Sequence, residues 1–113
     1  MTTPPASSPP YDGEWEFVTI DGTDPEDPSE VVGQHTALIV ASNGTVHIAY
    51  SQNNYEDVLL WSNPVTGAST IQTMVEFGSV GMYNSIAEGP SGLVHIVTHE
   101  RVRGDLIHTS YSP

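Results

Sequence analysis

The chain of 113 residues contains no cysteine and no lysine. Without cysteine it can form no disulfide and offers no thiolate as a nucleophile or metal ligand. Arg101 and Arg103 are its only arginines, against 14 aspartates and glutamates, so the formal net charge is −12. Nucleic acid and anionic membrane surfaces bind basic proteins. We therefore expect neither of them to be a partner.

Long hydrophobic runs and helical spacing of apolar residues are also missing. No run of about 18 apolar residues occurs, which is the length that a membrane-spanning helix needs. Apolar and polar residues instead alternate over short stretches between turn residues, a pattern typical of β-strands. The sequence predicts an all-β fold without membrane insertion.

The acidic residues are concentrated at the N-terminal end, where eight of the 14 precede residue 31. Residues 1–13 are rich in Pro, Ser and Thr and are predicted to form a flexible tail, followed by a folded unit over residues 14–113. Residues 21–30 combine prolines with carboxylates. Their spacing does not match a calcium-binding EF-hand loop, so a solvated loop is the simpler interpretation. We expect no metal and no cofactor.

An internal repeat organises the chain. Gly44-Thr-Val-His-Ile-Ala-Tyr50 returns 48 residues later as Gly92-Leu-Val-His-Ile-Val-Thr98. Residues 32–62 align with residues 80–110 without a gap, and each copy is expected to fold as one structural unit. Eight of the 31 aligned positions are identical: Val32, Gly33, Gly44, Val46, His47, Ile48, Asp57 and Ser62 in the first copy.

Short strands are expected at regular spacing in both copies. Asn43-Gly44 is a dipeptide typical of tight hairpins. Residues 15–20 alternate well enough for a further strand but have no hairpin partner after them. The expected strands cover residues 36–41, 45–51, 57–62 and 70–76, then residues 84–87, 93–99 and 105–111.

Four antiparallel strands repeated at this period indicate a β-propeller blade. The second copy, Val80-Gly-Met-Tyr-Asn-Ser-Ile-Ala-Glu-Gly-Pro-Ser-Gly-Leu-Val-His-Ile96 followed by Gly104-Asp-Leu-Ile-His-Thr-Ser110, resembles a blade of the bacterial sialidase-like propellers. The resemblance implies two four-stranded antiparallel blades over about residues 14–111. The motif is typical of a propeller blade and does not indicate an enzymatic activity.

Two blades cannot close a propeller, which typically has four to eight. The second blade lacks its outer strand, and the strand expected at residues 15–20 lacks a sheet. Head-to-tail oligomerisation with exchange of the N-terminal strand would complete both. Three copies would give six blades and four would give eight. The chain thus resembles the small two-blade lectins that trimerise, although it could also be a fragment of a longer propeller.

Histidine and aspartate recur at equivalent positions in the two copies. His47 and His95 could act as ligands or general bases, but repetition favours a structural role in a hydrogen-bonded blade network with Asp57 and Asp105. A catalytic group is seldom needed in every blade.

Catalysis is not expected. Sialidases hold the substrate carboxylate with three arginines, whereas this chain has two, and nothing selects Glu88 and Glu100 as the carboxylate pair of a glycoside hydrolase. Aromatic residues and planar polar groups point instead to carbohydrate binding. The candidate ligand-binding residues are Trp61, Tyr55, Tyr83, Glu100 and Arg101, with Asn53 and Asn54 beside them.

The functional expectation is therefore a non-catalytic, oligomeric binding module, lectin-like, whose partners are its own copies and glycans. The alternatives are a self-assembling structural subunit of a viral or extracellular surface and an excised or designed propeller fragment without activity. Trp61 could equally pack between blades, because aromatic side chains dominate such contacts.

Overall fold

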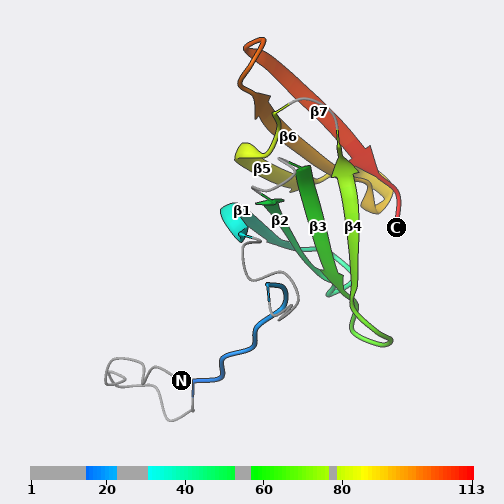
Figure 1. The fold of residues 1–113 in the computed structure, drawn as a ribbon. Coiled ribbons are helices and arrows are strands. Elements are labelled where there is room, and N and C mark those ends of the chain that lie inside the picture. Colours follow the sequence, from blue (N-terminus) through cyan, green and yellow to red (C-terminus); the bar gives the residue numbers. More distant parts are fainter. Residues whose placement is uncertain (1–14, 23–30, 53–56, 77–78) are drawn as a thin grey trace, which may run out of the picture.

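The computed structural model describes residues 15–22, 31–52, 57–76 and 79–113. Within them the chain forms seven β-strands and one short 3-10 helix (Figure 1), so the expected all-β class is confirmed. The expected tail at residues 1–13 lies outside the described residues, as does most of the acidic segment. The strands are β1 (Val32–Val40), β2 (Val46–Gln52), β3 (Asp57–Asn63), β4 (Thr70–Val75), β5 (Met82–Glu88), β6 (Val94–Glu100) and β7 (Asp105–Tyr111), with the 3-10 helix at Pro90–Gly92.

The strands form two antiparallel sheets, one for each copy of the repeat. The first sheet has the order β1-β2-β3-β4 and the second β5-β6-β7. The hairpin between β1 and β2 turns at Gly44, whose φ of 87° suits glycine, and Asn43 Oδ1 accepts a hydrogen bond from the Thr45 N–H. Each sheet is thus a meander built from adjacent segments of the chain.

The first strand of each sheet begins before the expected position. β1 starts at Val32 and β5 at Met82, whereas alternation predicted starts at residues 36 and 84. The pairing with the next strand shifts register in this region of both strands. A bulge inserts a residue and interrupts the alternation of side chains between the two faces. The alternation of apolar and polar residues therefore did not reveal the part of each strand that precedes the bulge.

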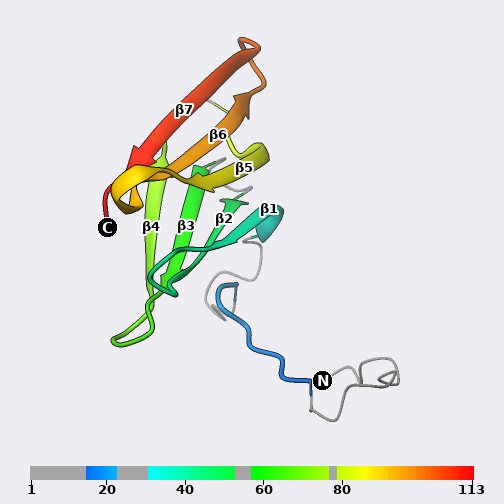
Figure 2. The same cartoon turned by 180° about the vertical axis from the view of Figure 1, so that it is seen from behind.

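The core lies between the two sheets. β5 lies beside β1 and β2 (Figure 2). The face of each sheet that points toward the other sheet, called here its inner face, is the better buried one. Ala49, Val58 and Leu60 of the first sheet pack in one cluster with Val94 and Ile96 of the second. Burial of this apolar surface holds the two repeats together.

The opposite, outer faces are only partly covered in the single chain: on the first sheet Tyr50 and Leu59 are buried, whereas the residues farther along their strands are half-buried or exposed. On the first sheet the register aligns one apolar residue from each strand in a row, Leu38, Ile48, Trp61 and Ile71. Leu38 is 58% and Ile71 46% exposed. This row crosses the whole width of the first sheet.

The outer face of the second sheet is different in character. His95, Val97 and His99 of β6 point to it, with Leu106 and His108 of β7 opposite them in the register. Leu106 is 77% exposed. Three of the five histidines of the chain therefore lie on one uncovered face.

The repeat relates each outer face to an inner one. Equivalent residues occupy the same strand and the same register position in the two copies, so they point to the same side of their sheets. His95 and Val97 on the outer face of the second sheet correspond to His47 and Ala49, which are buried at the inner face of the first. Conversely, Ile48 on the outer face of the first sheet corresponds to Ile96 in the core. Each uncovered face is thus the counterpart of a covered one.

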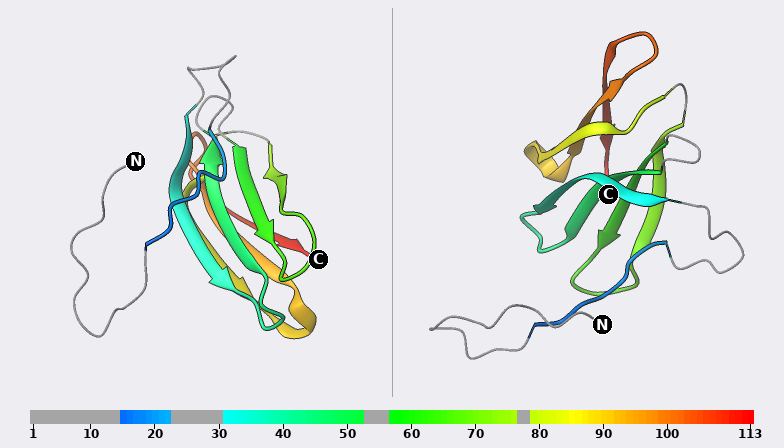
Figure 3. Two further views of the ribbon diagram at one scale, coloured as in Figure 1. Left: turned by 90° about the horizontal axis from the view of Figure 1, so that it is seen from below. Right: turned by 60° about the vertical axis from the view of Figure 1, so that its left-hand side comes forward.

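The segment 15–20 is extended but belongs to neither sheet in the part of the chain that the structure describes. In the right-hand view of Figure 3 it runs outward from the first sheet. Trp15, Phe17 and Val18 are all more than half exposed. Its connection is fixed at Asp21, whose carboxylate accepts a hydrogen bond of 2.8 Å from the Tyr50 hydroxyl. None of the described residues forms a helix long and apolar enough to cross a membrane.

Candidate functional site

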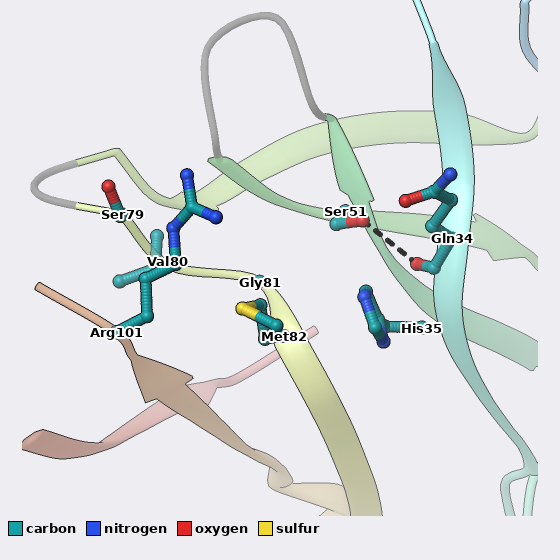
Figure 4. Close-up of a pocket in the computed structure, with 8 residues that line it drawn as sticks. All are labelled: Gln34, His35, Ser51, Ser79, Val80, Gly81, Met82 and Arg101. Atoms are coloured by element: carbon teal, nitrogen blue, oxygen red, sulfur yellow. Dashed lines mark hydrogen bonds between the residues drawn. The ribbon is translucent and has the colours of Figure 1, made fainter. Parts of the chain in front are cut away.

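A cleft of about 320 Å³ opens between the two sheets, where β1 and β2 meet the start of β5 (Figure 4). Its size is at the lower end of the range for small-molecule sites. Gln34, His35 and Ser51 stand on one side and Ser79 and Arg101 on the other, as the close-up shows. Polar groups from both repeats thus face the same space. Val80, Gly81 and Met82 complete the lining.

The backbone at the cleft is held in unusual conformations. His35 and Tyr83 occupy the same position of the repeat, and both have a left-handed φ, 54° and 55°. Their rings meet edge to face with centroids 5.1 Å apart. The Asn84 side-chain N–H donates to the His35 carbonyl at 3.0 Å and to the Gly81 carbonyl at 3.1 Å. Such strain persists where the surroundings enforce it, often at binding sites.

The close approach of the two sheets at the cleft requires glycine. A Cβ at Gly81 would lie 2.9 Å from the Cβ of Ser51 and 3.0 Å from the Asp57 carbonyl oxygen. The Thr98 hydroxyl accepts a hydrogen bond of 2.9 Å from the Gly81 N–H. Ser51 in turn donates from its hydroxyl to the Gln34 carbonyl at 3.0 Å. The floor of the cleft is therefore fixed by hydrogen bonds.

Glu100 fixes the hairpin that carries Arg101. Its carboxylate is 1% exposed and accepts hydrogen bonds from the backbone N–H groups of Ser79, Val102 and Arg103, at 3.2, 3.1 and 2.8 Å. The Arg101 N–H donates to the Ser79 carbonyl at 3.1 Å. Hydrogen bonds, first that from Arg103, lower the pKa of the Glu100 carboxyl against the opposing effect of burial. Glu100 is therefore an ionised structural group that places Arg101 beside the cleft.

The predicted ligand-binding residues are divided among several places. Arg101 lies at the cleft, and Tyr83 lies beside it, 71% exposed and in contact with His35. Glu100 is buried behind the cleft. Trp61 lies on the outer face of the first sheet, in the apolar row, away from the cleft. Tyr55, Asn53 and Asn54 lie outside the described residues.

The repeated histidines have different partners in the two copies. His47 is buried, and its Nδ1 lies 2.8 Å from the Ser62 hydroxyl. Asp57 pairs with Gln52 at the other end of the same two strands, so it does not reach His47. His95 Nδ1 lies 2.9 Å from His108 Nε2, although Ser110 is the counterpart of Ser62. The expected histidine–aspartate pairing is thus replaced by a serine in one copy and a histidine in the other.

Asp105 likewise occupies a different place from the one expected for it. It begins β7 opposite Glu100, five positions from the residue opposite His95, and its carboxylate lies 3.6 Å from Arg103 Nε. Burial and then the nearby Glu76 raise the pKa of its counterpart Asp57. The two aspartates therefore share a strand position but not an interaction with histidine.

Gln34, His35 and Ser51 line the cleft but were not among the candidates from the sequence. They lie in or next to the bulge, where alternation fails. The available signal was the repeated Val-Gly at residues 32–33 and 80–81, because a repeated glycine marks a required backbone conformation. Gly33 and Gly81 were interpreted only as an identical pair of the repeat, and so the site beside them was not predicted.

The cleft is lined by side chains that can donate or accept hydrogen bonds and by apolar groups beside them. Its side chains are an amide, an imidazole, a hydroxyl, a guanidinium and a thioether. In the described part of the chain no group of three or more His, Asp or Glu side chains is placed to hold a metal ion. No protein-family model, curated protein or solved structure matches the chain.

Proposed function

We propose that the chain is a non-catalytic β-propeller subunit that assembles head to tail and binds glycans in the clefts between adjacent sheets. Each sheet would be one blade, as the repeat and the resemblance to sialidase-like propellers suggest. Three or four copies would supply the six or eight blades of a closed ring.

The observation that carries the proposal is that the second sheet lacks a fourth strand, while the extended segment 15–20 lacks a sheet. The first sheet has four strands and the second has three, with the β7 edge open. The extended segment 15–20 has six residues, as β4 has, and no sheet of its own in the described chain. Exposed strand edges and unpaired extended segments readily pair with other chains. Pairing of segment 15–20 with β7 of a neighbour would complete the second blade.

The relation between inner and outer faces supports the same assembly. The outer face of the first sheet corresponds by the repeat to a face that packs a sheet in this chain, and so does the outer face of the second. A neighbour whose first sheet covers the second sheet of this chain would reproduce the contact already present between the two repeats. Such a head-to-tail contact closes into a ring when the rotation permits.

Glycan binding is supported by the chemistry of the cleft. A sugar carries hydroxyl groups around a ring whose two faces expose apolar C–H groups. The cleft combines polar side chains for the hydroxyl groups, Gln34, Ser51 and Arg101, with the aromatic ring of Tyr83 beside them. A ring would repeat the cleft in each copy, and several weak sites on one particle gain affinity through multivalency.

Glu88 and Glu100, the two carboxylates considered from the sequence, do not favour glycoside hydrolysis. The Glu88 carboxylate accepts hydrogen bonds from the backbone N–H and the hydroxyl of Ser42, at 2.9 and 3.0 Å. The pKa of Glu100 is lowered, whereas a general acid for glycosidic cleavage needs a raised one.

The proposal is tested by glycan-array binding with the assembled protein, followed by titration of the best glycan against Arg101→Ala and Arg103→Ala. We expect Arg101→Ala to weaken binding about tenfold to a hundredfold, the usual cost of about 1.5–3 kcal/mol for losing a charged hydrogen-bond donor. Arg103→Ala is the matched control, because the Arg103 side chain is 67% exposed, lies near Asp105 and Glu100, and does not line the cleft. Absence of any binding glycan, or equal losses in the two variants, would contradict glycan binding at the cleft.

A structural role is the second candidate, and the apolar row on the first sheet favours it. Leu38, Ile48, Trp61 and Ile71 support contact with another copy irrespective of any ligand. Electron micrographs that show filaments or extended arrays, together with an array that contains no binding glycan, would select this function over a lectin.

A further inference from the structure

We propose that assembly of the chain is acid-sensitive, because the docking face for the next copy carries a cluster of three histidines that must be neutral while it is covered. His95, His99 and His108 form this histidine cluster on the outer face of the second sheet. The inference rests on the head-to-tail assembly proposed above. It adds to that assembly a condition under which the ring forms and a condition under which it separates.

The pair at the centre of the cluster has a geometry that permits only one shared proton. His95 Nδ1 and His108 Nε2 lie 2.9 Å apart, and the rings are stacked at an angle of 14°. A hydrogen bond between these two nitrogens needs one N–H donor and one acceptor with a free lone pair. Protonation of both rings places an N–H on each facing nitrogen. The hydrogen bond is then lost, and two like charges are adjacent.

The first sheet shows what happens to a histidine at this position when a sheet covers it. His47 is the counterpart of His95, and the second sheet covers it to 1% exposure. Burial lowers the pKa of His47, and the nearby Glu88 partly opposes that effect. Covering the second sheet in the same way would impose the same burial on His95, with His99 and His108 beside it.

The compensating carboxylate is missing at the contact between copies. The counterpart of Glu88 in the first sheet is Val40, so the covered His95 would face valine where His47 has glutamate. The counterparts of Ile86, Val94 and Ile96, which form the opposite wall inside the chain, are also apolar: Leu38, Val46 and Ile48. A cation buried against these side chains has no partner, which makes its burial costly.

The charged groups around the cluster do not change this conclusion. On its own sheet the neighbours that point to the same face are Ser85 and Ala87 of β5 and Leu106 and Ser110 of β7, none of them ionisable. Gly89 packs against the His95 ring, where an added Cβ would lie 2.8 Å from Nε2. On the covering face Asp57 lies at the far end of β3, and Asp21 is engaged by Tyr50. The incoming segment 15–20 would bring Glu16 to the β7 edge, and not to the centre of the face.

Histidine is the side chain that ordinarily changes charge between pH 5 and 8. In the separated chain the three rings lie on an open face, whereas the proposed ring would enclose them among apolar side chains, an environment that favours the neutral form of histidine. For each proton taken up on separation, the association constant of the ring falls about tenfold for each unit by which the pH is lowered. This holds in the pH range where the histidine of the separated chain is protonated and the covered one is neutral. Two or three such protons would convert a stable ring into single chains over one to two pH units.

The test is the solution mass of the full chain, by light scattering after size exclusion, at about pH 7.5 and about pH 5.5, with circular dichroism to confirm that the strands persist. We expect a discrete trimer or tetramer at the higher pH and folded single chains at the lower one. The variant His95→Gln/His99→Gln/His108→Gln should remain assembled at both, because glutamine carries no titratable charge. His35→Asn, which leaves the cluster intact, should separate as the unsubstituted chain does.

Each contrary result has its own meaning. Single chains at both pH values would overturn the head-to-tail assembly itself. An oligomer that persists at the lower pH would overturn acid sensitivity and leave the assembly standing. Separation of the triple variant at the lower pH, to the same extent as the unsubstituted chain, would show that other groups cause the effect. Loss of the strands at the lower pH would show unfolding in place of release.

Discussion

His35 and Tyr83 hold left-handed backbone conformations at the same position of the repeat, next to the cleft. For a residue with a Cβ this conformation costs about 1–2 kcal/mol, and asparagine tolerates it better than most side chains. A β-branched side chain is a poor fit there. We expect His35→Val to be less stable than His35→Asn by about 1–2 kcal/mol, as measured by urea unfolding at one protein concentration.

Thr36 offers the matched control for this comparison. It is the next residue of β1, exposed and without a left-handed φ. In an ordinary strand position valine is favoured over asparagine, so Thr36→Val should be at least as stable as Thr36→Asn. If His35→Val also proved more stable than His35→Asn, the left-handed conformation would not be what constrains that residue.

Among the elements, the sequence predicted the strands well wherever apolar and polar residues alternate. β6 and β7 were expected within one residue of their observed bounds, because Val94, Ile96 and Thr98 are buried and the residues between them less so. Prediction failed at Val32–Gln34 and at Met82–Tyr83, where bulges and left-handed residues interrupt the period of two. The cleft lies at these same interruptions, and so alternation could not locate it.

The partners of the buried polar groups were equally hard to predict. The repeat identified His47 and Asp57 as equivalent to His95 and Asp105, but their partners depend on cross-strand register. Register is set by where each hairpin turns and by bulges, and a shift of one residue changes every pair. A repeat gives equivalent positions, whereas the contact that each position makes depends on its own neighbours.

The N-terminal segment 15–20 is the element on which the proposed strand exchange depends. Proline lacks the backbone N–H that donates hydrogen bonds between paired strands. Successive residues of a strand point their N–H groups to opposite sides, so one of any two adjacent residues donates to a given neighbouring strand. Phe17→Pro/Val18→Pro would therefore remove a ladder hydrogen bond in either register. We expect this variant to keep the circular dichroism of a folded chain, since the segment 15–20 joins neither sheet here, and to elute as a single chain.

The matched control keeps the strand propensity of both positions. Phe17→Thr/Val18→Thr leaves each N–H in place and introduces another β-branched residue. It should still assemble, although more weakly because apolar contact is lost. Assembly of the proline variant to the same mass as the unsubstituted chain would refute exchange of this segment.

At the level of the whole molecule, the apolar residues exposed on the outer face of the first sheet have no role in packing the single chain. A domain of this size usually covers its apolar strands on at least one side and leaves polar residues on the other. Here the first sheet carries apolar residues on both, with Ala49 and Leu60 inside and Leu38 and Ile71 outside. A sheet with apolar residues on both faces is suited to packing between two neighbours, and in the proposed assembly a second copy would supply the missing one.

Leu38 gives the most direct test of that contact. It is 58% exposed at the β1 end of the apolar row, so Leu38→Lys should leave the single chain folded. In the proposed ring the added ammonium would be buried against the histidine cluster face of the next copy, which offers it no carboxylate, and an uncompensated buried charge costs several kcal/mol. We expect folded single chains in light scattering at neutral pH, where the unsubstituted chain is expected to give a trimer or tetramer.

Val102→Lys adds the same charge at a hairpin residue that is 74% exposed and lies on neither outer face, so it should assemble normally. If both variants assembled alike, the apolar row would not be the contact between copies, and the two sheets would have to meet their neighbours through the strand edges alone.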